Sequence, residues 1–236
     1  MKVARLESHH LTKWIDSLPW KPTSKNDAIS VAQRMFNWAI EHGHLKQSPV
    51  PKIKKPKRQR REVHYTKKQW DAVREHANGC FTDFLDFLWS TGCRPKEARD
   101  LEARHVDLKS GLAMFQSAEA KGEIPRVIFL TPESREILAR LVEKRPEGRI
   151  FLNSRGLPWT KDSVKCRLTR ISKKVGFRVI AYGARHSYCT RALKQGVNAT
   201  VVASLLGHKD ASMISKVYSH LAKDIEFLKV QAKNVS

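Results

Sequence analysis

Cysteine is scarce in this chain, and the few that occur are far apart. The 236 residues include 4 cysteines, and no two of them stand at the C-x-x-C spacing of structural zinc sites and redox motifs. This spacing argues against a disulfide framework, and no histidine cluster completes a set of metal ligands. We therefore assign no metal and no cofactor, and we expect the cysteines to be small core residues: Cys80, Cys93, Cys166 and Cys189.

Long apolar runs are also missing. No stretch approaches the ~20 residues that cross a bilayer. The first residues, Met1-Lys2-Val3-Ala4-Arg5, lack the apolar segment of a signal peptide. The sequence thus indicates no membrane partner, and we expect a cytoplasmic protein. Hydrophobic residues make up 41% of the chain and charged residues 29%, as in a globular protein with a substantial core.

Acidic residues are few relative to basic ones. The chain has 23 Asp and Glu against 45 Lys and Arg, which gives a formal net charge of +22 and a pI near 10.2. These positive charges repel one another unless a polyanion is close by, so nucleic acid is the favoured partner. The alternative is a merely soluble or ribosome-like basic protein, although such proteins rarely combine this charge with a large core that contains aromatic residues.

The first 50 residues favour a small helical domain. A short amphipathic stretch precedes a longer one from Ser24 to Ile40, whose apolar residues fall on one broad helical face. Ser24 with Asp27 resembles a capping box, and Gly43 stands just past the end of this helix. Two or three helices of this size hold no robust core alone, so we expect them to pack against a partner surface.

A basic, proline-rich linker, residues 51–65, follows this domain. Proline stiffens the segment into an extended form, which suits contact along a phosphate backbone. A solvated run of charge is the alternative explanation. The predicted DNA contacts are the basic residues of the linker: Lys52, Lys54, Lys55, Lys57, Arg58, Arg60 and Arg61.

Residues 66–236 predict a larger, mostly helical domain with a small antiparallel sheet. Thr66-x-x-Gln69 is a capping box at its start. We predict two strands, 112–115 and 126–130, around a turn at 120–123, and a further short strand at 150–152. Helices are predicted over 81–89, from residue 95, and over 131–144, 160–175, 185–195, 199–206 and 212–230. The expected fold class is therefore mainly α, of the α+β type.

Five chemically distinctive residues stand in order along this second domain: Arg94, Lys121, Arg185, His208 and Tyr218. Attack on a DNA phosphate requires cationic donors for the non-bridging oxygens, an acid for the leaving oxygen and a nucleophile in line with it. Arginine suits the first task because its planar guanidinium gives two parallel hydrogen bonds to phosphate. Taken singly, most of these residues have an ordinary structural explanation. Arg94 can form an ion pair with Glu97, and Lys121 can be a solubilising charge at a turn. His208 can interact with the C-terminal end of a helix, and Tyr218 can pack in the core.

Four short motifs make the pattern specific. Thr91-Gly92-Cys93-Arg94-Pro95-Lys96-Glu97-Ala98 resembles the first-arginine box of the tyrosine recombinases, also called the phage integrase family. Arg185-His186-Ser187-Tyr188 resembles the second-arginine box, and Leu205-Leu206-Gly207-His208 resembles the Leu-Gly-His box. Val217-Tyr218-Ser219-His220 is similar to the nucleophile box, and Lys121 matches the lysine of the family's hairpin. These matches cover nearly the whole second domain.

The resemblance implies a role for each matched residue. Arg94 and Arg185 bind the scissile phosphate, the latter from a helix start, and His208 donates to it. Glu97 holds the first box together, Lys121 protonates the leaving 5′-oxygen, and Tyr218 is the nucleophile.

The resemblance also implies what the whole protein does. It points to a site-specific recombinase that joins itself to the 3′-phosphate of double-stranded DNA through tyrosine, with no metal, ATP or small-molecule substrate. Such enzymes work as tetramers on paired DNA sites, so we expect self-association and a place in the nucleoid. Residues 66–236 correspond to the catalytic domain, and residues 1–50 to part of the helical domain that clamps DNA.

The chain departs from the family pattern in two places. Tyr182 stands three residues before Arg185, where the family usually has histidine. Tyrosine titrates near 10, so it is a poor general base, although its hydroxyl can still donate to phosphate. We therefore predict a slower but active enzyme. The N-terminal helical domain is also shorter than the family's usual one, from which we expect weaker site affinity and greater sensitivity to salt.

Two alternatives to a recombinase remain open. A type IB topoisomerase shares the mechanism but relaxes supercoils as a monomer without sequence preference. A DNA-binding regulator derived from a recombinase that has lost catalysis would fit the presence of Tyr182 and the short N-terminal domain. Formation of a covalent DNA adduct separates the regulator from both enzymes.

Overall fold

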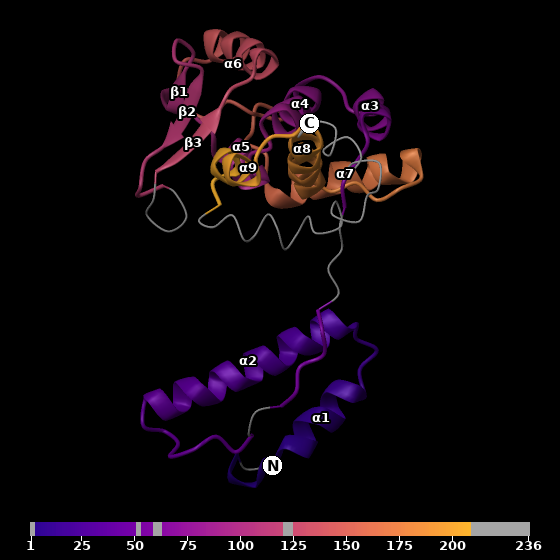
Figure 1. The fold of residues 1–236 in the computed structure, drawn as a ribbon, viewed down its shortest axis with the longest axis vertical. Helices are drawn as coiled ribbons and strands as arrows, with labels where there is room; N and C mark the ends of the chain where they lie inside the picture. The colour runs from indigo at the N-terminus through magenta and orange to yellow at the C-terminus, as the bar shows by residue number, and fades with distance from the viewer. Residues whose placement is uncertain (1–2, 51–52, 59–62, 120–124, 209–236) are drawn as a thin grey trace, which may run out of the picture. The chain divides into compact units, whose positions relative to one another are not determined.

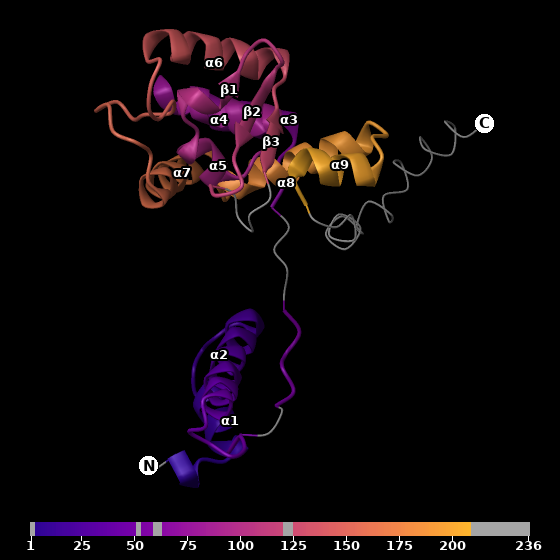
Figure 2. The same cartoon turned by 90° about the vertical axis from the view of Figure 1, so that its left-hand side faces the viewer.

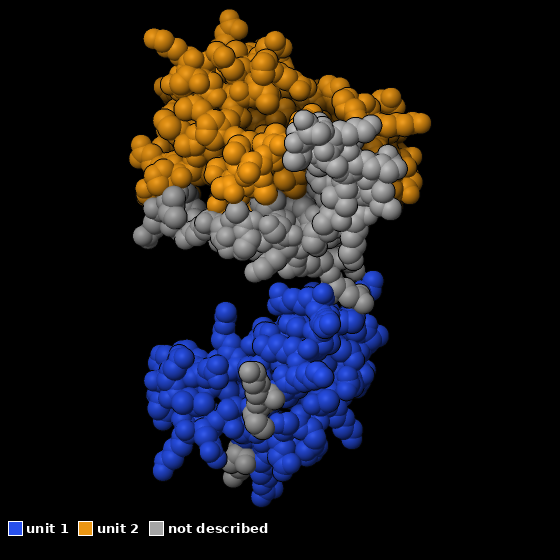
Figure 3. All heavy atoms as spheres, viewed as in Figure 1, with its two compact units in different colours: residues 1–61 blue, residues 62–236 orange. Residues whose placement is uncertain are grey.

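The computed structural model of this chain describes residues 3–50, 53–58, 63–119 and 125–208. The chain divides into two compact units, residues 1–61 and 62–236 (Figure 3). Among the described residues, no helix is long and apolar enough to cross a membrane.

Unit 1 is built from two α-helices and a short 3-10 helix. The helices are α1, Ser8–Asp16, and α2, Pro22–Glu41, preceded by η1, Val3–Arg5 (Figure 1). Ile15 of α1 and Ile29 and Phe36 of α2 are buried and form its small core. The predicted capping box at Ser24 is wrong, because α2 begins earlier, with Pro22 in its first turn, where a missing N–H costs nothing.

The helices of unit 2 surround α4, Cys80–Thr91, whose side chains are buried from Phe84 to Thr91. Helix α4 packs against α6, Pro132–Lys144, and α8, Ala181–Lys194. The remaining helices of the described part of unit 2 are α3, Lys67–Glu75; α5, Pro95–Asp100; η2, Ala103–His105; α7, Lys161–Val175; and α9, Ala199–Leu206.

Several predicted helix ends are confirmed. The Thr66 hydroxyl accepts from Gln69 N, and the Gln69 side chain accepts from Thr66 N, so the capping box of α3 is present. Gly92 and Gly176 end α4 and α7 with φ values of 63° and 77°, in the left-handed region that glycine favours. By contrast, α8 begins at Ala181 rather than at Arg185, so the predicted position of Arg185 at a helix start is wrong.

A three-stranded antiparallel sheet lies beside the helices. Its order is β1, Val106–Asp107, then β2, Leu112–Phe115, then β3, Arg126–Phe129. The β2–β3 pairing places Ala113 opposite Ile128 and thereby confirms the predicted hairpin strands, while the turn at 120–123 lies outside the described residues. The predicted strand at 150–152 is wrong, because Leu152 makes only an isolated bridge, with Pro158.

The fold is mainly helical with a small antiparallel sheet, as predicted. Helix α9 contacts both α8 and β3, so the end of α9 lies where two helices and a strand come together (Figure 2). Of the four cysteines, Cys93 and Cys189 are buried and Cys80 is half-buried. Cys166 is exposed on α7, which corrects the expectation that it is a core residue.

Candidate active site

Three arginines donate to three successive carbonyls at the C-terminal end of α9. The last carbonyls of a helix have no partner within it and carry partial negative charge, so they attract cations. The three bonds join Arg126 Nη1 to Leu205 O at 3.1 Å, Arg185 Nη2 to Leu206 O at 2.7 Å, and Arg94 Nη2 to Gly207 O at 2.9 Å. The loop that leads to His208 is thus fixed by guanidinium groups from β3, α8 and α5.

Glu97 joins two of these arginines. Its Oε1 accepts from Arg94 Nη1 at 2.6 Å and from Arg126 Nε at 3.3 Å, and its Oε2 accepts from Arg94 N at 2.8 Å. Burial alone would raise the pKa of Glu97, but the charges of Arg126 and Arg94 outweigh burial and lower it. Glu97 is therefore ionised and neutralises one positive charge. The three arginines carry three, so the cluster keeps an excess of positive charge.

Arg185 is the most deeply buried of the three arginines. Only 2% of its surface is exposed, and its Nη1 donates to Gly92 O at 3.0 Å, which links α8 to the end of α4. Burial, and then the charge of Arg94, lowers the pKa of Arg185. A guanidinium destabilised by burial and by a like charge gains from a nearby anion, so this site favours binding of a negative group.

His208 follows the loop directly. Its backbone N donates to Ala203 O at 2.9 Å, and its Nδ1 is buried with no hydrogen-bond partner among the described residues. Burial, and then the charges of Arg185, Arg94 and Arg126, lower the pKa of His208 to about 4. At neutral pH the imidazole is therefore uncharged, and one ring nitrogen carries a proton that can be donated.

Tyr182 lies on the first turn of α8 and is 44% exposed. Its ring makes an edge-to-face contact with His186, with the centroids 5.2 Å apart. The hydroxyl-bearing side chain is thus accessible on the same helix that carries Arg185. His186 is also one of the groups whose electrostatic effect lowers the pKa of His208.

Some predicted site residues lie outside the described part of the chain. These are Lys121, Tyr218, Lys52, Arg60 and Arg61. Of the other linker residues, Lys54, Lys55 and Lys57 are exposed. Arg58 is exposed as well and contacts α2, where Nε donates to Asn26 Oδ1 at 3.1 Å and Nη2 donates to Asp27 Oδ1 at 2.5 Å.

Arg126 is the site residue that sequence reasoning missed. The sequence pattern predicts only a strand at residues 126–130. The alternation of Arg126 with Ile128 places both side chains on the buried face of β3, and both are buried. A buried arginine needs partners, so an arginine in the core register of a strand is the signal that could have found it.

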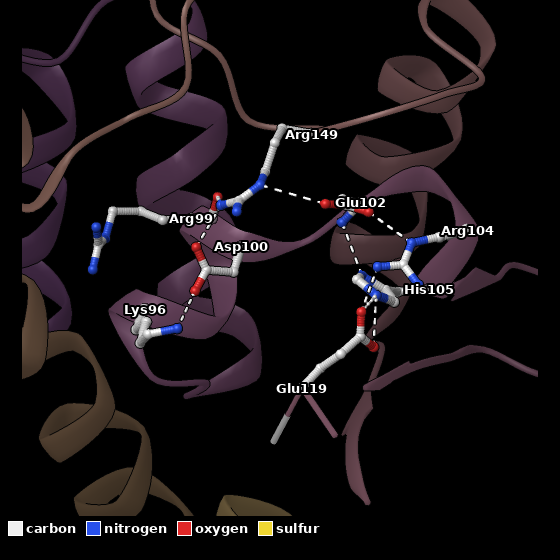
Figure 4. Close-up of polar contacts among 8 residues, drawn as sticks. All are labelled: Lys96, Arg99, Asp100, Glu102, Arg104, His105, Glu119 and Arg149. Atoms are coloured by element: carbon white, nitrogen blue, oxygen red, sulfur yellow. Dashed lines mark hydrogen bonds and ion pairs between the residues drawn. The ribbon is translucent and has the colours of Figure 1, made fainter. Parts of the chain in front are cut away.

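A second polar network anchors the segment that follows β2. Glu119 accepts from Arg104, and His105 Nε2 lies 3.3 Å from Glu119 Oε2 (Figure 4). Because His105 Nδ1 accepts from Glu102 N at 3.0 Å, its Nε2 is the nitrogen that faces Glu119 as a donor. Glu119 stands two residues before Lys121, so the network fixes the chain just before the predicted acid.

Within the described ranges, no three histidine, cysteine, aspartate or glutamate side chains are placed to hold a metal ion. The positive charge of the site is instead supplied by arginine. The arrangement around residues 205–208 combines a surplus of guanidinium charge with a neutral histidine donor.

Comparisons with known proteins identify the family. Residues 59–224 match the model of the phage integrase family. Tyrosine recombinase XerA of Saccharolobus solfataricus is 26% identical over 98% of this chain and 81% of its own length. Tyrosine recombinase XerC of Lactobacillus delbrueckii subsp. bulgaricus is 30% identical over 57% of this chain, which spans only about half, 48%, of that relative.

Solved structures share the fold. The Tn1549 transposon integrase in complex with transposon right end DNA has a TM-score of 0.76 at 16% identity and covers 98% of this chain and 87% of its own. A lambda integrase dimer bound to a COC′ core site has a TM-score of 0.76 at 17% identity, over 92% of this chain and 81% of its own. Because the family model matches more than half of the chain, this protein belongs to the phage integrase family, the tyrosine recombinases.

Proposed function

We propose that this protein is a site-specific DNA recombinase that cleaves and rejoins DNA strands through a 3′-phosphotyrosyl intermediate. The observation that carries the proposal is the convergence of Arg94, Arg185 and neutral His208 at the end of α9. These are the donors that a phosphate under attack requires, and they come from three separate helices or their ends. Family membership supports the same reaction.

The chemistry assigned to each residue balances as a transesterification. The Tyr218 hydroxyl gives its proton to solvent as its oxygen attacks the scissile phosphorus and forms a new P–O bond, while the bond from phosphorus to the 5′-oxygen breaks. Lys121 supplies a proton to the departing oxygen, and Arg94, Arg185 and His208 hold the non-bridging oxygens. The bond energy stays in the phosphotyrosyl ester, so a 5′-hydroxyl reverses the step without ATP.

Tyr182 occupies the position where the family usually has histidine. Because a phenolic hydroxyl can donate a hydrogen bond, we assign the Tyr182 hydroxyl to donation toward the phosphate rather than to removal of the Tyr218 proton. Its 44% exposure and its place one turn before Arg185 support this assignment. Slower activation of Tyr218 follows, and thus a slower enzyme than one with a histidine base.

The substrate in this proposal is double-stranded DNA. The net charge of +22 supports it, and so do the DNA-bound states of the Tn1549 and lambda integrases with which the fold is shared. We further propose a tetramer on paired sites, with residues 66–236 as the catalytic domain, residues 51–65 as a basic linker and residues 1–50 as part of a DNA clamp. Because the proposed substrate is DNA, we place the protein in the nucleoid.

A trapping experiment tests the proposal. A nicked suicide duplex carrying the recognition sequence loses the attacking 5′-hydroxyl after cleavage, so a covalent protein–DNA adduct accumulates. The parent protein should form an adduct that resists denaturing detergent, whereas Tyr218→Phe should bind the same duplex and form none. DNA binding without any adduct from the parent protein would instead favour a regulator that has lost catalysis.

A further inference from the structure

Arg126 occupies the interior of the site rather than its surface. Its side chain is 9% exposed, and it lies at the start of β3 on the face that packs on the core. It makes bonds in three directions: Nε to Glu97 Oε1 at 3.3 Å, Nη1 to Val127 O at 2.5 Å and Nη1 to Leu205 O at 3.1 Å. A charge buried so deeply is retained only where its partners hold it.

Gly207 rests directly on this guanidinium. A Cβ built on Gly207 would lie 2.8 Å from Arg126 Nη1 and 3.0 Å from its Cδ and Cζ. Gly207 also has φ of 64°, which favours glycine for a second reason. The backbone next to His208 therefore packs directly against the Arg126 guanidinium, because Gly207 has no side chain to separate the two.

Glu97 extends the same connection to Arg94. Its Oε1 accepts from both Arg126 and Arg94, so the carboxylate is shared between a buried cation and a half-exposed one, whose side chain is 34% exposed. Without Arg126, Glu97 would be left with Arg94 as its nearest cationic partner. Arg94 would then be held more tightly to the carboxylate and would be less free to bind an anion.

We propose that Arg126 is a positioning residue for strand cleavage, which holds the Leu205–Gly207 backbone and Glu97 so that Arg94 and His208 face the same phosphate. The inference rests on the proposed function. Arg126 Nε and Nη1 are bonded to Glu97 Oε1, Val127 O and Leu205 O, so we assign its effect to these neighbours rather than to a contact with the phosphate. Removal of Arg126 should slow the chemical step far more than it weakens DNA binding.

Single-turnover cleavage of the suicide duplex at saturating DNA tests this separation. Arg126→Met keeps the length and volume of the stem but removes the donors, and we expect about 100-fold slower cleavage with DNA affinity changed only a few-fold. Arg126→Lys keeps the charge and should recover part of the rate. If Arg126→Met folds and cleaves at the parent rate, the inference is wrong.

Arg191 offers a matched control in the same unit. Arg191 lies on α8 and is half-buried, and its Nη2 donates to Trp89 O of α4 at 2.7 Å rather than to a carbonyl of residues 205–207. Arg191→Lys should lower the melting temperature but leave the cleavage rate within a few-fold of the parent. If Arg191→Lys and Arg126→Met lose the same stability and also the same fraction of the cleavage rate, the role of Arg126 is merely structural and the inference is overturned.

The titration of His208, followed by NMR without DNA, provides a readout that general destabilisation does not move. Burial is the largest cause of its low pKa, followed by the charges of Arg185, Arg94, Arg126 and His186. Arg126→Met should therefore raise the pKa of His208 from about 4 toward 6.5, and Arg191→Lys should leave it in place. An unchanged His208 titration in Arg126→Met would show that Arg126 does not act on His208 and would contradict the inference. Failure of the parent protein to cleave DNA would count against the proposed function alone.

Discussion

Arg185 and Arg94 donate to the carbonyls of adjacent residues, Leu206 at 2.7 Å and Gly207 at 2.9 Å. The two guanidinium groups come from positions about ninety residues apart in the sequence, yet one short stretch of backbone holds both. Because each arginine uses only some of its five N–H donors in this way, the pair can bind the loop and still present donors to a phosphate. This shared loop is the structural basis of the predictions below.

Replacement of Arg185 by lysine should keep the positive charge but lose the planar arrangement of hydrogen-bond donors. Lysine cannot donate to both Gly92 O and Leu206 O in the arrangement that the guanidinium makes. We expect about 100-fold slower cleavage of the suicide duplex, together with a lower melting temperature from the buried carbonyls that lose a donor. Lys194→Arg, at the end of the same helix, serves as the control and should change neither quantity. A fully active Arg185→Lys would exclude a bidentate role.

The Glu97 carboxylate should contribute stability that depends on pH. Its pKa is lowered in the folded protein, so this contribution is complete above the unfolded carboxyl pKa and is lost as pH falls through the lower folded value. Glu97→Gln should cost about 3 kcal/mol of unfolding free energy near neutral pH. The difference in unfolding free energy between parent and variant, measured in urea, should narrow as pH falls below the usual range of a carboxyl group. A gap that is constant across this range would contradict the ion pairs.

His208 should also lose its contribution to stability as pH falls, because its pKa in the folded protein is likewise lowered. The folded protein favours the neutral ring, with a pKa of about 4 against an ordinary 6.5, so stability is full above 6.5 and is lost as pH falls toward 4. His208→Gln removes this dependence, and its unfolding free energy should therefore fall less than that of the parent over the same interval. Addition of DNA should raise the pKa of His208, because a bound phosphate offsets the arginine charges. An NMR titration that gives an ordinary value without DNA would refute this environment.

The cysteines should react with thiol reagents in the order of their exposure. Cys166 is exposed, whereas Cys93 is buried, and burial together with Glu97 raises the pKa of Cys93 to about 12. Native protein should therefore label first at Cys166, and Cys93 should label only after unfolding. Peptide mapping after brief alkylation measures the order. Rapid labelling of Cys93 in folded protein would mean that the loop at residues 92–94 opens readily.

The sequence predicted those features that depend on local chemistry. Thr66 with Gln69 forms its capping box, Gly176 ends α7, and the strands of the β2–β3 hairpin pair as expected. Each of these follows from backbone preferences that neighbouring residues determine. The mainly helical fold class followed from the same local signals.

Other features depend on contacts between distant residues and could not be predicted in this way. The run at 150–152 is apolar like a strand, yet Ile150 and Phe151 are buried in the core without a neighbouring strand to pair with along the described chain. Arg126 gains its role only because Leu205 and Glu97 contact it in the folded protein. In the sequence, Leu205 is 79 residues away and Glu97 is 29 residues away. The motifs identified Arg94, Arg185 and His208, but their common support on the end of α9 required the structure.

The most direct test of the central claim is to identify the residue that becomes bound to DNA. The adduct formed with a suicide duplex can be digested with protease and nuclease, and the modified peptide located by mass spectrometry. We predict a nucleotide joined through its 3′-phosphate to Tyr218, with the adduct lost in Tyr218→Phe and strongly reduced in Arg185→Lys. An adduct on another residue, or none in a parent protein that binds the duplex, would contradict the account.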